Sequence, residues 1–375
     1  MITNIHTHIF TFSQVPEKFI PGQKFFFNYA WQQKLLVKIL QGIPILKRFQ
    51  KIERLALFLK KGTYQSQEEI FKKLTAYYPS STRFGVHSMD FESMGAGKCK
   101  QGYGFEEQIK ELAALKENPE WSEKILPFIC VDPRRKGIVE LAKDYIENKG
   151  FAGVKMYPAL GYYPNDERLA PLFAWLEKKG IPIMVHCSRS GPVYGRTDLE
   201  DLDRKKLWGN SRKDWANEYT NPGNYIEIFE KYPKIKICFA HFGGDTDCME
   251  YYKEAGDNKI CKGCENKACK KCKEDINWFL FIVDMLEKYE GAYADISYSA
   301  GDDDLTALFT IYAKTYNAKT PYQLGDKILF GSDYYMAHMT RNERWFSINV
   351  RATMGEETFG KISETNINNF LKRSE

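Results

Sequence analysis

The sequence contains no run of about 18 apolar residues, so it predicts no membrane-spanning helix. Its first residues also lack the basic stretch followed by an apolar run that marks a secretory signal peptide. The nine cysteines are an odd number, and a chain of 375 residues is far too long for a disulfide scaffold. These absences together favour a cytoplasmic protein whose thiols stay reduced.

The glycine-rich fingerprint of many doubly wound sheets is missing after the first predicted strand. The chain has instead eight short apolar segments, typical of strands buried on both faces: residues 2–9, 83–89, 125–131, 152–157, 182–186, 235–241, 292–298 and 328–333. Amphipathic helical segments lie between them, including residues 105–116, 137–149, 169–179 and 277–289. This alternation predicts a (β/α)8 TIM barrel of the α/β class, as one domain over residues 1–375.

Two insertions interrupt the regular alternation, at residues 10–68 after the first strand and at residues 243–275 after the sixth. Both follow a strand and precede a helix, so we expect both to lie over the catalytic mouth of the barrel. We interpret the first as a helical lid, because its residues 34–61 have an amphipathic pattern. The alternative is a surface that binds an anionic membrane or nucleic acid.

The net charge of +5 is concentrated in these insertions. Residues 34–61 carry eight Lys and Arg against one acid, and residues 259–273 carry six Lys against one acid. The rest of the chain is therefore acidic. A positively charged approach to the barrel mouth would suit an anionic small molecule, and it argues against nucleic acid binding by the whole protein.

Four cysteines are crowded into the second insertion with paired Cys-x2-Cys spacing: Cys261, Cys264, Cys269 and Cys272. Two such pairs can supply the four thiolates of a closed, structural Zn²⁺ site, which is the interpretation that we favour. An iron–sulfur cluster can use the same ligands, and free thiols or disulfides are the remaining alternative.

Histidine is scarce, with six in the chain, and four of the six lie at or near the C-terminal ends of predicted strands. His6 and His8 are two apart on the first strand, so both face the barrel axis. His186 ends the fifth strand, His241 the sixth, and Asp333 the eighth. Barrel enzymes place catalytic groups at these C-terminal strand ends. Histidines together with a carboxylate can hold a divalent metal and leave one position open for water.

In this ordered set the chain resembles the amidohydrolase superfamily, above all the branch of aminocarboxymuconate semialdehyde decarboxylase and its hydrolase relatives. The resemblance implies that His6, His8, His186 and Asp333 ligate one metal ion, expected to be Zn²⁺. His241 would contact the metal-bound water or the developing charge of the substrate. Such a metal lowers the pKa of water from about 16 towards about 7. Asp333 would accept a proton from that water and return it to the leaving group.

Lys155 on the fourth strand leaves three interpretations open. The segment around it is similar to the lysine segment of dihydroorotase, which implies a carboxylated lysine that bridges two metals, with His186 and His241 on the second. A free ammonium that pairs with a substrate carboxylate is the second interpretation. A lysine that extends to solvent at the barrel rim is the third.

Two further residues are candidates for substrate binding. Arg189 follows His186 by three residues, and a guanidinium at the mouth can form a fork with a carboxylate. An ordinary loop salt bridge is the alternative for Arg189. Tyr157 ends the fourth strand and is expected to line the pocket, although aromatic residues at strand ends also serve in packing.

We therefore expect a metal-dependent hydrolase that cleaves a C–N or C–O bond of a small, anionic molecule with metal-activated water. The enzyme alternative is a non-oxidative decarboxylase, a lactonase or a hydratase that uses the same site. The alternative of another class is a zinc-containing protein that binds nucleic acid or a protein partner. A homo-oligomer is compatible with the sequence, which does not determine the oligomeric state.

Overall fold

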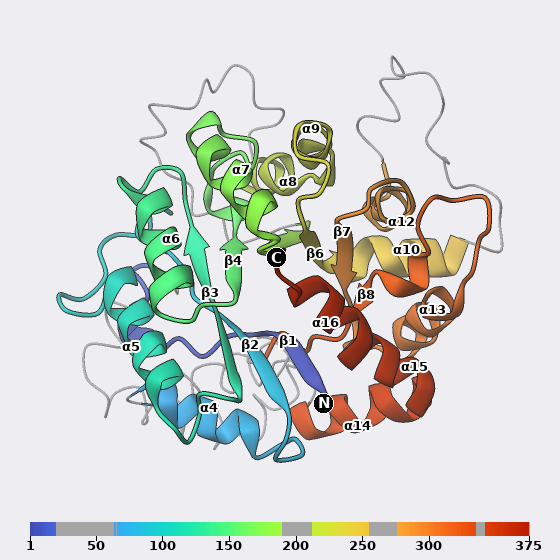
Figure 1. The fold of residues 1–375 in the computed structure, drawn as a ribbon, viewed down its shortest axis with the longest axis horizontal. Coiled ribbons are helices and arrows are strands. Elements are labelled where there is room, and N and C mark those ends of the chain that lie inside the picture. The colour runs from blue at the N-terminus through green and yellow to red at the C-terminus, as the bar shows by residue number, and fades with distance from the viewer. Residues whose placement is uncertain (20–63, 65, 190–211, 255–275, 335–341, 375) are drawn as a thin grey trace, which may run out of the picture.

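The computed structural model describes residues 1–19, 64, 66–189, 212–254, 276–334 and 342–374. Its eight parallel strands form one sheet in sequence order, with each strand hydrogen-bonded to the next. Figure 1 shows the strands at the centre of the molecule and the helices around them. The predicted TIM barrel is thereby confirmed. The strands are β1 (Thr3–Thr7), β2 (Arg83–His87), β3 (Ile125–Val131), β4 (Gly153–Met156), β5 (Ile183–Ser188), β6 (Ile237–Gly243), β7 (Ala292–Asp295) and β8 (Ile328–Leu329).

The chain after β8 closes the barrel against β1. The amide of Ile5 donates to the carbonyl oxygen of Phe330 at 3.0 Å, and the amide of Asp333 donates to that of His6 at 2.8 Å. Gly331 lies so close to β1 that an added Cβ would stand 2.7 Å from the Cβ of His6. A glycine is therefore required where the two ends of the sheet meet.

The last two strands are shorter than the predicted segments. β7 ends at Asp295 because the chain then turns, with Tyr298 at a φ of 60° and a 3-10 turn at Ser299–Gly301. β8 ends at Leu329, because the residues after it form separate backbone hydrogen bonds with β1 and no regular ladder. The predicted functional residue Asp333 therefore lies four positions beyond the strand.

The helices follow the predicted alternation, and several begin at a side-chain cap. Asn277 accepts from the amide of Leu280 at 3.2 Å, and Asp302 accepts from that of Asp304 at 2.9 Å. The described helices are α4 (Gln67–Thr75), α5 (Phe105–Glu117), α6 (Ile138–Asn148), α7 (Ala170–Lys179), α8 (Arg212–Thr220), α9 (Ile226–Lys231), α10 (Asp245–Glu254), α12 (Trp278–Lys288), α13 (Asp303–Lys314), α14 (Glu343–Met354), α15 (Glu356–Gly360) and α16 (Asn366–Leu371).

The two insertions lie largely outside the described residues. Of residues 10–68, the structure describes 10–19, 64 and 66–68, so the basic region at 34–61 is not included. Of residues 243–275, it describes the end of β6 and helix α10, and the four clustered cysteines lie outside it. Within the described ranges, none of the helices has the length and apolar character needed to cross a membrane.

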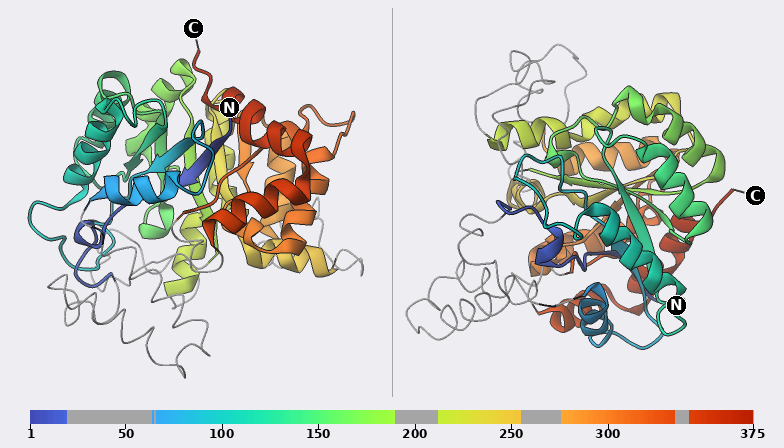
Figure 2. Two further views of the ribbon diagram at one scale, coloured as in Figure 1. Left: turned by 90° about the horizontal axis from the view of Figure 1, so that it is seen from below. Right: turned by 90° about the vertical axis from the view of Figure 1, so that its left-hand side faces the viewer.

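One end of the barrel is filled by apolar side chains. Phe128, Met184 and Leu329 of three strands form one buried cluster with Ile367 and Phe370 of α16. Both chain termini lie towards this end in the two views of Figure 2. The closed end leaves the opposite, C-terminal ends of the strands as the place for polar chemistry.

Candidate active site

Three ligand-type atoms converge at the C-terminal ends of β1 and β8. Nε2 of His6 and Nε2 of His8 lie 3.3 Å apart. Oδ1 of Asp333 lies 3.7 Å from the first of these nitrogens and 3.5 Å from the second. All three residues are buried. The intervening Thr7 turns away and donates its hydroxyl to the carbonyl oxygen of Gly85 at 2.8 Å.

The second ring nitrogens of both histidines face acceptors. Nδ1 of His6 lies 2.8 Å from Oδ2 of Asp295, and Nδ1 of His8 lies 3.1 Å from the carbonyl oxygen of His87. Each Nδ1 therefore carries a proton, and each Nε2 offers a lone pair to the shared point. Two such nitrogens beside the Asp333 carboxylate form a donor set that fits a divalent metal ion.

His186 and His241 form a second pair beside this group. Nε2 of His241 lies 3.2 Å from Nδ1 of His186, whose Nε2 lies 3.1 Å from the hydroxyl of Ser188. His241 also belongs to a second group of metal-type atoms, with His6 and Asp295. His186 belongs to neither group, so its role as a ligand stays a prediction.

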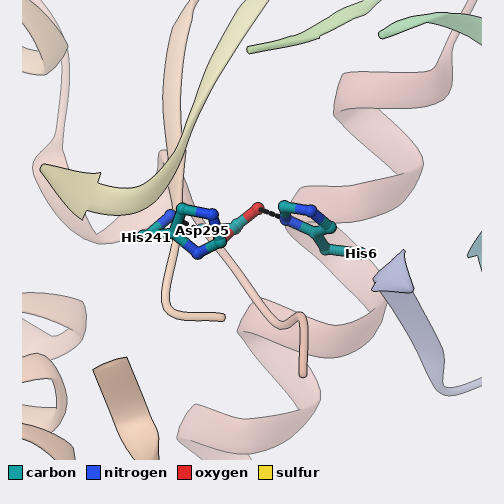
Figure 3. A group of neighbouring side chains, drawn as sticks. All are labelled: His6, His241 and Asp295. Carbon is teal, nitrogen blue, oxygen red and sulfur yellow. Dashed lines mark hydrogen bonds and ion pairs between the residues drawn. The ribbon is translucent and has the colours of Figure 1, made fainter. Parts of the chain in front are cut away.

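Sequence reasoning did not find Asp295, the last residue of β7. This fully buried carboxylate accepts from His6, from the amide of His241 at 3.0 Å and from the amide of Ser297 at 2.9 Å. Figure 3 shows the carboxylate turned towards the His6 ring. Asp295 lies in the middle of the predicted strand 292–298, and only the structure ends that strand at Asp295. The sequence therefore offered no strand-end signal of the kind that identified Asp333.

Lys155 is completely buried, which excludes a lysine that extends to solvent. Its Nζ lies 3.2 Å from Nε2 of His6. Burial lowers the pKa of Lys155 to about 8, although Asp295 and Asp333 favour its charged form. Burial likewise raises the pKa of Asp333, and the nearby lysine lowers it. Lys155 is not among the residues that line the cavity described below.

The site histidines are held neutral by their surroundings. Burial lowers the pKa of His6, His8 and His186 well below the usual value, and Lys155 adds to the effect. For His241, burial lowers the pKa to about 4. Neutral imidazoles are the form that binds metal ions, so this electrostatic environment suits a metal centre.

A cavity of about 290 Å³ lies over the site. Its polar lining includes the predicted residues His8, His186, His241 and Asp333. Much of the remaining lining is aromatic or apolar, with Phe10, Phe19, Met89, Phe91, Tyr157 and Tyr298.

The two predicted substrate-binding residues both line this cavity. The Tyr157 ring lies 4.2 Å from the ring of His186, centroid to centroid. Arg189 is already engaged, because its Nε and Nη2 donate to the two carboxylate oxygens of Asp247 at 2.8 and 3.1 Å. Its Nη2 also donates to the carbonyl oxygen of Ile276 at 2.8 Å.

Solved structures of two decarboxylases and a hydratase share this fold across almost their whole length. The 5-carboxyvanillate decarboxylase from Sphingomonas paucimobilis is 11% identical with a TM-score of 0.52, over 100% of this chain and 99% of that one. A manganese-bound dihydroxybenzoic acid decarboxylase from Polaromonas sp. is 15% identical with a TM-score of 0.52, over 99% and 96%. A 4-oxalomesaconate hydratase from Rhodopseudomonas palustris is 14% identical with a TM-score of 0.50, over 99% and 95%.

None of the curated proteins matches the sequence. The family model described as Amidohydrolase matches residues 107–370, which is more than half of the chain and includes His186, His241, Asp295 and Asp333. The barrel, the buried metal-type group at its C-terminal end and this match agree, and the chain therefore belongs to the amidohydrolase family of enzymes.

Proposed function

We propose that the protein is a metal-dependent, non-oxidative decarboxylase of a small aromatic or conjugated carboxylic acid. The observation that carries this proposal is the cavity, which is lined both by histidine and aspartate side chains of the kind that bind metal ions and by aromatic side chains. The ring of Phe91 lies 5.2 Å from that of Phe10 and 4.9 Å from that of Phe19. Such walls favour a planar, apolar ring over a flexible amide or ester.

The named relatives support the same substrate class. The similar structures include decarboxylases of 5-carboxyvanillate and of dihydroxybenzoic acid, which are aromatic acids by name. The basic segments 34–61 and 259–273 lie outside the described residues, and their position over the barrel mouth is a prediction from the sequence. Positive charge there would attract a carboxylate, which supports an anionic substrate. We propose that this chain acts on an acid of that kind.

His6, His8 and Asp333 would hold the metal, with His186 as the proposed fourth ligand. We propose Zn²⁺, and Mn²⁺ is the alternative that the manganese-bound relative suggests. When bound, the ion would supply Lewis acidity that polarises the oxygens of the substrate. His241 is left for proton chemistry.

The chain's own residues can supply both proton transfers that decarboxylation needs. His241 is neutral and has an unprotonated Nε2, so it can accept the proton of a ring hydroxyl. Asp333 lies beside His6 and His8 at the floor of the cavity, and we propose that it delivers a proton to the ring carbon that bears the carboxylate. The bond from that carbon to the carboxylate then breaks, its electron pair returns to the ring, and CO₂ leaves.

Sequence reasoning ranked hydrolysis first, and the aromatic walls favour decarboxylation instead. Hydrolysis would use the same residues, with Asp333 taking a proton from water and returning it to the leaving group. A panel of hydroxybenzoates, lactones and amides, tested on Zn²⁺-loaded and Mn²⁺-loaded protein, separates the two. Release of CO₂ from a hydroxybenzoate supports the proposal, whereas turnover confined to amides or lactones would contradict it.

The number of metal ions depends on Lys155. We propose that the Lys155 amine acts at the metal ions and does not contact the substrate. It contacts His6, a proposed ligand, and it does not line the cavity. Metal analysis with and without bicarbonate tests the carboxylated form. Two barrel equivalents with bicarbonate and a lysine heavier by one CO₂ would support the bridge, and one equivalent with unmodified lysine would exclude it.

For the second insertion we propose a structural Zn²⁺ held by Cys261, Cys264, Cys269 and Cys272. The support is the spacing alone, since these residues lie outside the described ranges. Cys264→Ser should lower the zinc content by one equivalent and leave the barrel metal in place. A coloured protein that contains iron would contradict the zinc assignment.

We also propose that the protein works in the cytoplasm. Among the described residues, Cys99, Cys130, Cys187, Cys238 and Cys248 are free thiols, which suits a reducing compartment. A homo-oligomer is compatible with the sequence, and light scattering of the purified protein would determine the oligomeric state.

A further inference from the structure

Asp295 receives four hydrogen bonds in a fully buried position. Nδ1 of His6 donates to its Oδ2 at 2.8 Å. The amides of His241 and Ser297 donate to Oδ1 at 3.0 and 2.9 Å, and the Ser297 hydroxyl donates to the same oxygen. Figure 3 shows Asp295 with the two histidines that it contacts. One carboxylate thus contacts a proposed metal ligand, His6, and the proposed proton acceptor, His241.

The positions of the protons follow from these contacts. Ser297 has one hydroxyl proton, which goes to Asp295, so its Oγ acts as an acceptor towards both rings. That oxygen lies 3.0 Å from Nδ1 of His6 and 3.0 Å from Nδ1 of His241. The Ser297 carbonyl oxygen lies 3.2 Å from Nδ1 of His241 and also accepts. Both Nδ1 atoms therefore carry the proton, and both Nε2 atoms present lone pairs.

The same carboxylate supports an unusual backbone conformation. His241 has a φ of 64°, in the left-handed region that residues other than glycine rarely adopt. Its amide points at Asp295 in that conformation. Losing the carboxylate would free both the backbone and the ring of His241.

We infer that Asp295 is a positioning residue that sets the tautomer of His6 and the orientation of His241 at once, with Ser297 as the link to the second ring. This inference rests on the proposed metal site. It assigns Asp295 no place as a ligand, because its oxygens already accept four bonds. The competing role is a ligand of a metal shared with His6 and His241, whose metal-type atoms lie within 4.8 Å of one another.

Asp295→Asn is the decisive substitution, because it keeps the shape and changes one acceptor into a donor. If the new carbonyl oxygen keeps the amide of His241, the new amide group faces Nδ1 of His6. His6 must then give up its Nδ1 proton and carry one on Nε2, where it can no longer ligate. We expect the affinity for Zn²⁺ or Mn²⁺ to fall by about 10- to 100-fold.

Two variants serve as controls. Asp132→Asn removes another buried carboxylate at a strand end, which is paired with Arg134 and does not line the cavity. It should leave the metal dissociation constant within about threefold of the wild type. Ser297→Ala keeps the bond from His6 to Asp295, so it should also keep the metal affinity while it lowers turnover through His241.

The readouts are metal affinity, by chelator competition, and the histidine tautomers, by ¹⁵N NMR of the metal-free protein. We expect His6 in the wild type to be protonated on Nδ1, and in Asp295→Asn on Nε2. A wild-type His6 protonated on Nε2 would overturn the inference even if the variant failed to fold. A variant that binds metal as tightly as the wild type would do so too. Neither readout needs a substrate, so they stand apart from a failure to find decarboxylase activity.

Discussion

Nε2 of His241 lies 3.2 Å from Nδ1 of His186, so the ends of β6 and β5 meet in a direct contact between two buried imidazoles. The two rings have different second partners. His241 faces Ser297 with its other nitrogen, whereas His186 faces the hydroxyl of Ser188. We propose that the two rings serve one centre in different ways, His186 as a ligand and His241 as a proton acceptor.

Removing either imidazole should therefore have a distinct effect. His186→Asn should weaken metal binding by more than about 100-fold, since outer-shell losses alone cost 10- to 100-fold. His241→Asn should leave the metal bound and lower kcat by about 10² to 10⁴. Chelator competition and turnover of metal-loaded protein measure the two effects. Equal metal loss in both variants would point to two ligands instead.

The buried lysine should make the metal-free protein more stable at alkaline pH. The pKa of Lys155 is lowered from 10.5 to about 8, so between these values the unfolded chain binds more protons than the folded one. The free energy of unfolding should therefore increase with pH between about 8 and 10.5, by up to about 1.4 kcal/mol per pH unit. Lys155→Met should remove this contribution in urea unfolding at pH 8, 9 and 10.

Lys327 provides the matched control for that experiment. Its pKa is also lowered to about 8 by burial, but it lies beside Glu290 and Tyr293, away from the cavity. Lys327→Met should remove a similar part of the increase in unfolding free energy with pH and leave metal affinity unchanged. If Lys155→Met leaves the slope of the wild type intact, the pKa assigned to Lys155 is wrong.

Arg189 should matter more for stability than for substrate binding. Its guanidinium joins the end of β5 to Asp247 of α10 and to the backbone before α12, and it lies 4.6 Å from the Trp278 ring centroid. Arg189→Met leaves the buried Asp247 carboxylate without its cationic partner, which should cost about 3 kcal/mol.

A double-mutant cycle tests the Arg189 assignment. Because the two residues act as one pair, the loss in Arg189→Met/Asp247→Asn should be smaller than the sum of the single losses. Urea unfolding supplies these values, and steady-state kinetics supplies KM. A large rise in KM without a loss of stability would restore Arg189 as a substrate-binding residue.

A second ion pair tests how far burial controls stability away from the metal. Arg135 donates to both oxygens of fully buried Asp90 at 2.6 and 3.0 Å. Arg135→Met should cost about 3 kcal/mol in urea unfolding. The ion pair of exposed Arg168 with partly exposed Asp166 is the control, and Arg168→Met should cost less than about 1 kcal/mol. Equal losses would contradict the argument from burial.

The sequence predicted the barrel because its strands are continuous apolar runs, which are readable without any knowledge of contacts. It located His6, His8 and Asp333 for a related reason, since residues at the same ends of parallel strands must meet. That logic did not reach Asp295, because the apolar pattern predicts a strand over 292–298, whereas β7 ends at Asp295. Only its contacts with His6 and His241 reveal its position in the site.

Side-chain partners far apart in the sequence were beyond such reasoning. Arg189 and Asp247 are 58 positions apart, so no spacing rule could show that the guanidinium was occupied. The burial of Lys155 could not be predicted either, because the sequence pattern of its strand is the same whether the amine reaches solvent or is buried beneath the site. Its complete burial comes from packing that no local pattern encodes.

We propose that His6, His8 and Asp333 hold a metal ion at which CO₂ is removed from an aromatic acid. The most direct measurement is CO₂ release from a panel of hydroxybenzoates by metal-loaded wild type, His6→Ala and Asp333→Asn. We predict release by the wild type, restored after chelation by added Zn²⁺ or Mn²⁺, and at least about a 10³-fold loss in both variants. Release that persists in His6→Ala, or that is indifferent to chelation, would contradict the account.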